Sequence, residues 1–222
     1  MTADSAGGLA AIVCAATYVV GFALLVTVLA PLGYGTNAVD AVAVTAFAFE
    51  RPGLFIAWNM VIYILNGLAL AVLVVALHAR LAPAAPGPAA LSRMFGTIWA
   101  TLVLAAGMIA NIAVEGVRAG TVDPGAAAER WRMLHAVELG LGGGNEIAGG
   151  VWILTISLTA RGGPVLGPVA PQIGVATSVA GLATILPPLW DAAGTVFGLG
   201  AIGWFLAVGA ALLGPTSAPT RA

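Results

Sequence analysis

Residues 139–160 read LGLGGGNEIAGGVWILTISLTA, an apolar run of membrane-spanning length that carries one carboxylate, Glu146. A bilayer core of about 30 Å needs about 20 helical residues, so this run predicts a transmembrane helix. An acidic side chain at a helix centre costs about 2.5 to 3.5 kcal/mol on insertion scales. We therefore expect Glu146 to have a partner, to be protonated or to line a wet cavity.

Five further apolar runs of similar length lie on either side of this one. We predict an all-α polytopic integral membrane protein, a bundle of six transmembrane helices that forms a single transmembrane domain over residues 1–222 without a soluble domain. The expected helices lie near residues 8–30, 55–77, 96–117, 139–160, 172–189 and 193–213.

The composition supports membrane insertion and argues against other classes. Hydrophobic residues make up 60 % of the chain, charged residues 8 %, and the mean hydropathy is +1.04. A soluble domain needs a more charged surface. The chain has no lysine, and its eight arginines face nine acids, so we expect no nucleic-acid partner. The expected partner is the lipid bilayer.

Two connections contain additional helix signals. Asn37 and Asp40 form a capping pair that opens a short apolar helix in loop 1, which we expect on the membrane surface or against the bundle. Asp123 before Pro124 is an N-cap followed by proline at the first helical position. We expect this second helix to run on into residues 139–160. The glycines at 140 and 142–144 favour a flexible or kinked start there, not a nucleotide site, because no strand precedes them and no lysine follows.

The arginines give the orientation only weakly. If both termini face the cytoplasm, four arginines are inside and four outside. The inner four have no acid within their own turns, which favours cytoplasmic termini in a multi-pass protein of a bacterial inner (plasma) membrane. The inner set is Arg80, Arg93, Arg161 and Arg221, and the outer set is Arg51, Arg118, Arg130 and Arg132.

The tryptophans follow the same topology. Trp58, Trp131 and Trp190 fall at expected outer ends and Trp99 at an inner end, as in an interfacial belt. Trp152 and Trp204 lie deeper in their segments, so we expect them in the core.

Several segments resemble one family. They are residues 144–152 (GNEIAGGVW), 196–200 (VFGLG) and 203–205 (GWF), with an asparagine- and tyrosine-bearing second helix that ends near residues 77–81 (LHARL). Together they resemble the bacterial six-helix membrane proteins catalogued as domain-of-unknown-function family 4386. The resemblance covers most of the chain except loop 3. It implies a fold and a membrane location, and no chemistry.

Polar residues form one stripe on each of three successive helices. The stripes are Asn59, Tyr63 and Asn66; then Asn111, Glu115 and Arg118; then His135, Glu138, Gly142, Asn145 and Glu146. If the stripes face one another, they form an outward-opening pocket with Glu146 at its floor and His135, Glu138, Arg118 and Arg132 at its mouth. The asparagines also suit a purely structural role, since polar residues join membrane helices for about 0.6 kcal/mol each.

Metal and cofactor chemistry fits the sequence less well. His135 and Glu138, with Glu115 and Glu146, could supply one nitrogen and three oxygens to a metal. Arg118, Arg130 and Arg132 compete for these carboxylates, so we expect a solvated salt-bridge network and neither a metal nor a cofactor. The two histidines, His78 and His135, lie at opposite helix ends and cannot both ligate one haem.

Three function hypotheses follow. The first is a small transport or ligand-sensing protein in which Glu146 is protonatable and the asparagines line a pocket for an unknown small ligand. The second is a structural or accessory subunit, and the third is an intramembrane enzyme that uses Glu146 or Glu138 with His135 in acid–base chemistry. The short chain and the glycine-rich helix faces favour a homodimer.

Overall fold

The computed structural model describes residues 2–34, 38–118, 123–143, 146–163 and 165–214. Within these ranges the chain forms helices and connecting turns, with no strand. The predicted all-α class is confirmed. The Asn37 capping role, Asn145 and Arg221 fall outside the described residues.

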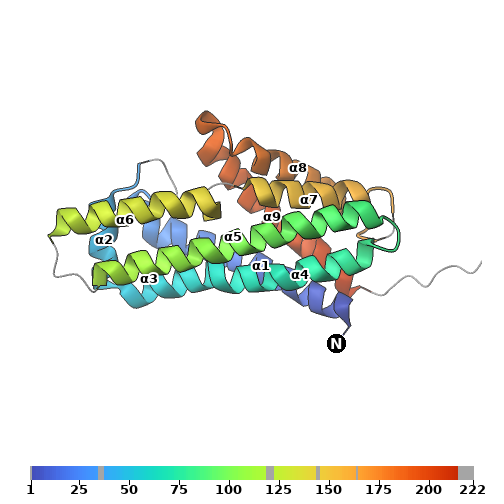
Figure 1. Cartoon of the computed structure of the whole chain (residues 1–222), viewed down its shortest axis with the longest axis horizontal. Coiled ribbons are helices and arrows are strands. Elements are labelled where there is room, and N and C mark those ends of the chain that lie inside the picture. Colours follow the sequence, from blue (N-terminus) through green and yellow to red (C-terminus); the bar gives the residue numbers. More distant parts are fainter. Residues whose placement is uncertain (1, 35–37, 119–122, 144–145, 164, 215–222) are drawn as a thin grey trace, which may run out of the picture.

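The helices follow one another along the chain with short connections (Figure 1). Five short π-helical or 3-10 segments of the described chain, η1 to η5, extend or join some of these helices. In order they are α1 (Ala3–Leu24), η1 (Leu25–Leu29), η2 (Ala30–Leu32), α2 (Ala41–Glu50), α3 (Pro52–Asn59), η3 (Met60–Leu65), α4 (Asn66–Leu81), α5 (Pro86–Arg118), α6 (Pro124–Glu138), η4 (Leu139–Gly143), α7 (Ile147–Ala160), α8 (Val169–Ala183), η5 (Pro187–Leu189) and α9 (Trp190–Leu213).

Four helical stretches among the described residues are long and apolar enough to cross a membrane: Ala3–Leu32, Pro52–Leu81, Pro86–Arg118 and Pro187–Leu213. At 1.5 Å per residue each exceeds a hydrocarbon core of about 30 Å. The apolar helices indicate a membrane-embedded protein. The count of six spans stays a prediction, because α8 has 15 residues and α7 has 14.

The expected continuous helix over residues 139–160 is interrupted, which corrects the sequence-based prediction. Gly142 has φ 141°, a conformation open to glycine and strained for other residues. η4 ends at Gly143, and α7 begins at Ile147 with Glu146 as its N-cap. Glycine has low helix propensity, so this glycine-rich start is where the helix breaks. Glu146 therefore lies at a helix end and not inside a helix.

The two helices expected in the loops are present. Asp40 caps α2 by accepting hydrogen bonds from the backbone N–H groups of Val42 and Ala43. Asp123 caps α6 by accepting one from Ala126. α2 packs against α6 and α5, so it is tucked against the bundle. Its position relative to a membrane surface stays a prediction.

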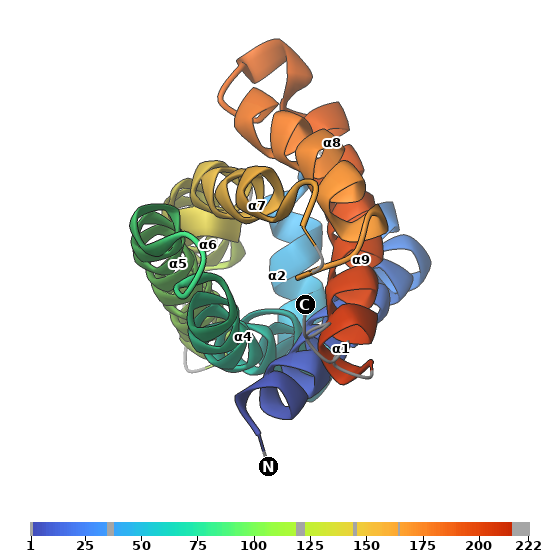
Figure 2. The same ribbon diagram turned by 90° about the vertical axis from the view of Figure 1, so that its right-hand side faces the viewer.

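The long helices close into a ring. α1 contacts α4, α4 contacts α5, α5 contacts α7, α7 contacts α8, α8 contacts α9, and α9 returns to α1. Figure 2 shows this arrangement along the long axis of the molecule. α6 packs beside the C-terminal half of α5, and α7 follows α6 along the same side of α5 (Figure 1).

Two apolar cores fill the molecule. The larger lies among α1, α4, α5, α7 and α9 and contains Trp99, Trp152 and Trp204. The smaller lies among α2, α3, α6 and the end of α5 and contains Trp58 and Trp131. Trp152 and Trp204 are core residues as expected. The interfacial belt predicted for Trp58, Trp99 and Trp131 is wrong, because no more than 6 % of any of the three is exposed. The Trp99 ring packs 5.6 Å from that of Trp152.

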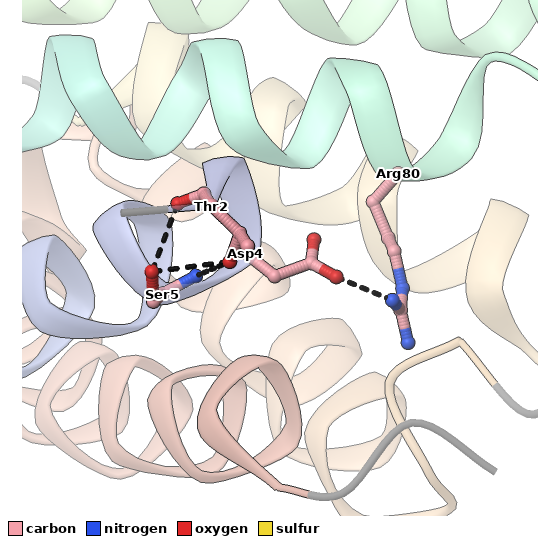
Figure 3. Close-up of polar contacts among 4 residues, drawn as sticks. All are labelled: Thr2, Asp4, Ser5 and Arg80. Carbon is pink, nitrogen blue, oxygen red and sulfur yellow. Dashed lines mark hydrogen bonds and ion pairs between the residues drawn. The ribbon is translucent and has the colours of Figure 1, made fainter.

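The beginning of α1 and the end of α4 are joined by an ion pair (Figure 3). The Asp4 Oδ2 and Arg80 Nη1 atoms are 2.6 Å apart, and Thr2 caps α1 by accepting a hydrogen bond from the backbone of Ser5. Arg80 thus has an acidic partner that is distant in sequence. The described chain ends, Thr2 and Gly214, lie toward the same end of the molecule (Figure 1), while their side of the membrane stays a prediction.

Replacing Gly149 with alanine should lower the free energy of unfolding. A Cβ atom there would lie 2.6 Å from the buried ring of Trp99, too close for a rigid neighbour. Overpacking of this kind costs about 1 to 3 kcal/mol. Thermal unfolding of the purified protein in detergent measures the effect. Gly53→Ala is the matched control, because nothing lies within 4 Å of its Cβ position; equal effects of the two substitutions would contradict the packing argument.

Candidate functional site

A cavity of about 210 Å³ lies between α1, η3, α5, α9 and the interruption of the α6–α7 chain. Its lining is mainly aromatic and small, with one carboxylate. The lining residues are Thr17, Tyr18, Gly21, Phe22, Leu25, Tyr34, Trp58, Ile62, Tyr63, Asn66, Val103, Gly142, Glu146, Gly194, Phe197 and Gly198.

Glu146 is held by its backbone and not by its side chain. Its N–H donates a 3.1 Å hydrogen bond to Thr184 Oγ1, and its carbonyl accepts one of 2.7 Å from Gly150. The carboxylate does not cap α7, and its buried Oε2 atom has no hydrogen-bond partner. The Trp99 indole is near enough to interact with the carboxyl, but its N–H makes no hydrogen bond of ordinary geometry. A buried carboxylate oxygen thus lies at the cavity without a hydrogen-bond partner among the described residues.

Asn66 combines a lining position with a packing role. Its Nδ2 atom donates a 2.7 Å hydrogen bond to Thr17 Oγ1 and a longer one of 3.5 Å to the Cys14 carbonyl. Thr17 in turn donates to Cys14 O at 2.8 Å. These bonds join α4 to α1 across 49 to 52 residues of sequence. Asn66 therefore positions one wall of the cavity.

Tyr63, Glu138 and His135 form a hydrogen-bonded chain beside the cavity. The Tyr63 hydroxyl donates to Glu138 Oε1 at 2.5 Å, and His135 Nδ1 lies 2.7 Å from Glu138 Oε2. Glu138 is 2 % exposed, so both oxygens of a buried carboxylate are satisfied. The His135 ring stacks on Trp131 with centroids 4.6 Å apart. This chain connects the cavity wall to α6.

Tyr34 is the centre of the aromatic wall. Its ring contacts those of Phe55, Trp58, Trp131 and His135, with centroid distances between 5.2 and 6.1 Å. Burial, and to a smaller extent the charge of Glu138, raises the pKa of the Tyr34 hydroxyl well above its ordinary value. The ring is therefore a neutral phenol at physiological pH. Trp58 is fixed by a 3.4 Å hydrogen bond from Nε1 to the Gly21 carbonyl.

Asn59 of α3 and Asn111 of α5, which were also expected in the pocket, lie outside the cavity lining. Asn59 is 1 % exposed, and neither of its side-chain polar atoms has a hydrogen-bond partner. Asn111 donates only to the Met60 sulfur, at 3.5 Å, and its Oδ1 atom has no partner. Neither asparagine lines the cavity.

The charged residues expected at the pocket mouth divide into two groups. His135 and Glu138 are buried beside the cavity. Glu115 and Arg118 pair with each other at 3.0 Å with about half of each side chain exposed, and Arg132 pairs with Glu129 on the surface of α6. The third-helix stripe therefore points out of the bundle and does not reach the cavity.

Sequence reasoning did not single out most of the aromatic lining. Tyr18, Phe22, Tyr34, Trp58 and Phe197 all line the cavity. The adjacent Thr17 and Tyr18 are a polar pair inside an apolar run, which is the one signal that could have indicated the first helix. Aromatic residues inside membrane helices otherwise resemble ordinary core residues.

Among the described residues, no group of three or more histidine, cysteine, aspartate or glutamate side chains is placed to hold a metal ion. No family model, curated protein or solved structure matches this chain. The family resemblance noted from the sequence therefore stays an expectation, and the site is interpreted from its own geometry.

Replacing Tyr63 with phenylalanine should destabilise the protein. The substitution leaves Glu138 Oε1 buried without a donor, and an unsatisfied buried group costs about 1 to 3 kcal/mol, more when it is charged. Tyr18→Phe is the matched control, because the Tyr18 hydroxyl makes no hydrogen bond to a described residue and its loss should change stability by less than about 0.5 kcal/mol. Thermal unfolding of both variants in detergent measures the difference. Similar melting temperatures of the two variants would mean that the Tyr63–Glu138 hydrogen bond does not stabilise the protein.

Proposed function

We propose that this protein is a small transport or ligand-sensing protein of the membrane, and that its ligand binds in the cavity at Glu146. The observation that carries the proposal is a buried carboxylate oxygen without an internal partner beside a cavity of about 210 Å³. Desolvating a carboxylate is costly, and a packing role would be served by an amide. A ligand that donates a hydrogen bond or carries a positive charge would supply the missing partner and offset the desolvation of the carboxylate.

The interrupted helix supports the same function. Transport proteins commonly form their sites at discontinuous helices, where helix ends and unwound backbone face the substrate. Here both sides of the interruption reach the cavity, through Gly142 of η4 and through Glu146 at the start of α7. Irregular backbone within a membrane protein is tolerated where it lines such a cavity.

The enzymatic alternative has less support. Its acid–base candidates were Glu146 or Glu138 together with His135. Both Glu138 oxygens are occupied by Tyr63 and His135, and the described residues contain no hydrogen bond between His135 and Glu146. The Glu138 carboxylate has no free oxygen for a substrate. The structural alternative is favoured for Asn66, whose donor groups bond to α1, but it gives no account of Glu146.

Replacing Glu146 with glutamine should raise stability by about 1 kcal/mol, as commonly happens when a strained functional group is removed. Glutamine keeps the shape of the side chain and removes the ionisable carboxyl group, whose Oε2 atom has no hydrogen-bond partner among the described residues. Melting temperatures at neutral pH in detergent measure the change. Glu129→Gln is the control, because it alters an exposed pair expected to contribute little. A clear loss of stability in Glu146→Gln would identify Glu146 as a structural carboxylate and contradict the proposal.

A cysteine at position 194 should react with a membrane-impermeant thiol reagent added outside intact cells. Gly194 lines the cavity, and nothing lies within 4 Å of its Cβ position, so the substitution fits. Trimethylammonium-ethyl methanethiosulfonate is a suitable reagent. Cys14 is buried, and changing it to alanine removes the background.

The control is a cysteine at Leu68, which is 56 % exposed on the apolar surface of α4. A thiol facing lipid should stay unlabelled, because only the thiolate reacts and lipid disfavours it. Labelling of Gly194→Cys only in inverted vesicles would mean that the cavity opens to the cytoplasmic side and not to the outside. Absence of labelling from both sides would mean a sealed cavity and would favour the structural role.

A further inference from the structure

The charged side chains of the cavity have one sign. Among the described lining residues Glu146 is the one carboxylate, and none is an arginine. The chain contains no lysine. Arg118 and Arg132, the arginines expected at the pocket mouth, are paired with Glu115 and Glu129 on the surface, and no ion pair joins an arginine to Glu146 among the described residues. No described cation of the protein therefore neutralises Glu146.

A second carboxylate lies behind the wall. Glu138 accepts a hydrogen bond from Tyr63, which lines the cavity, and its charge acts on the lining residue Tyr34. His135 is the group that faces Glu138 from the other side. Gly142, near the end of η4, brings the negative end of one helix dipole to this space, and Glu146 at the start of α7 lies at the positive end of another, so the two helix ends offset each other.

Aromatic rings supply most of the remaining surface. Six of the lining side chains are aromatic, and they come from four separate parts of the chain. They are Tyr18, Phe22, Tyr34, Trp58, Tyr63 and Phe197. The negative faces of such rings attract cations, and aromatic walls are the known way to hold quaternary ammonium groups.

The geometry points to a small organic cation, an amine or a quaternary ammonium compound, as the ligand of this cavity. The inference rests on the proposed function and names its ligand class. The carboxylate of Glu146 receives the ammonium group in a charge-assisted contact, and the rings cover its apolar part. An anionic ligand would be repelled by the carboxylate, and a neutral donor could bond to Glu146 Oε2 but would not compensate its charge.

The size of the cavity limits the ligand. Pockets for drug-sized molecules measure about 300 to 1,000 Å³, whereas this one measures about 210 Å³. A molecule with one ring or a short chain and a single amino group fits this limit. Larger cations such as polyamines with several charges do not match a cavity with one lining carboxylate.

The test compares three probes of the same shape and different charge. Benzylamine, benzyl alcohol and benzoate are titrated into the purified full-length protein at neutral pH by isothermal titration calorimetry. Benzylamine should bind at least about tenfold more tightly than benzyl alcohol, and benzoate should not bind, because a charge-assisted contact is roughly twice as strong as a neutral one.

Three variants locate the effect. Glu146→Gln should weaken benzylamine binding by about tenfold or more while leaving benzyl alcohol unchanged. Trp58→Leu should weaken benzylamine binding by a smaller factor, since one aromatic wall is lost. Glu129→Gln, a surface change, should leave all three probes unaffected.

The outcomes separate the two proposals. Benzyl alcohol or benzoate could bind as tightly as benzylamine or more tightly, and labelling of Gly194→Cys could abolish that binding. This result would overturn the cation inference and would leave the cavity as a site for a ligand of another class. No binding of any probe in a protein whose Gly194→Cys variant is labelled would also overturn the cation inference alone. Absence of both binding and labelling would overturn the cavity function as well.

Discussion

The interruption at Gly142 is the constraint on which the rest of the site depends. In a helix that continued from α6 through α7, the backbone N–H and C=O groups at the junction would bond within the helix, and the direction of the Glu146 side chain would be set by the helix rotation. The positive φ of Gly142 ends that helix, and α7 begins again at Ile147. Glu146 is thereby held by Thr184 and Gly150 through its backbone alone. Its side chain does not cap α7 and lines the cavity.

Polar groups in this bundle serve two different purposes, which the structure separates by their partners. Asn66 and the Tyr63–Glu138–His135 chain are satisfied within the protein and hold α1, η3 and α6 together. Glu146 differs because one oxygen is buried without such a partner. Asn59 shares this property but does not line the cavity. The binding function proposed for Glu146 therefore rests on both observations together, the missing partner and the adjacent cavity.

Much of the secondary structure could be predicted because its causes are local. The apolar runs predicted helices, and the Asp40 and Asp123 caps predicted where α2 and α6 begin. The glycines predicted a kink, although not that residues 139–160 would be two separate helices. The polar stripe of the third helix was expected to face the other two, yet Glu115 and Arg118 are exposed. Periodicity gives the residues that share a face of a helix and carries no information on which neighbour that face meets.

The sequence by itself determined the membrane class, the helical architecture and Glu146 as the residue to examine, since hydrophobicity and backbone hydrogen bonding act within single segments. Tertiary structure alone decided the rotation of each helix and hence the composition of the cavity. Close contacts at small residues set that rotation: a Cβ at Gly107 would lie 2.4 Å from Tyr63, so glycine lets α5 approach η3 there. The Tyr63–Glu138 hydrogen bond likewise joins residues that are 75 positions apart in the sequence. Contacts between distant segments depend on packing that no local pattern encodes.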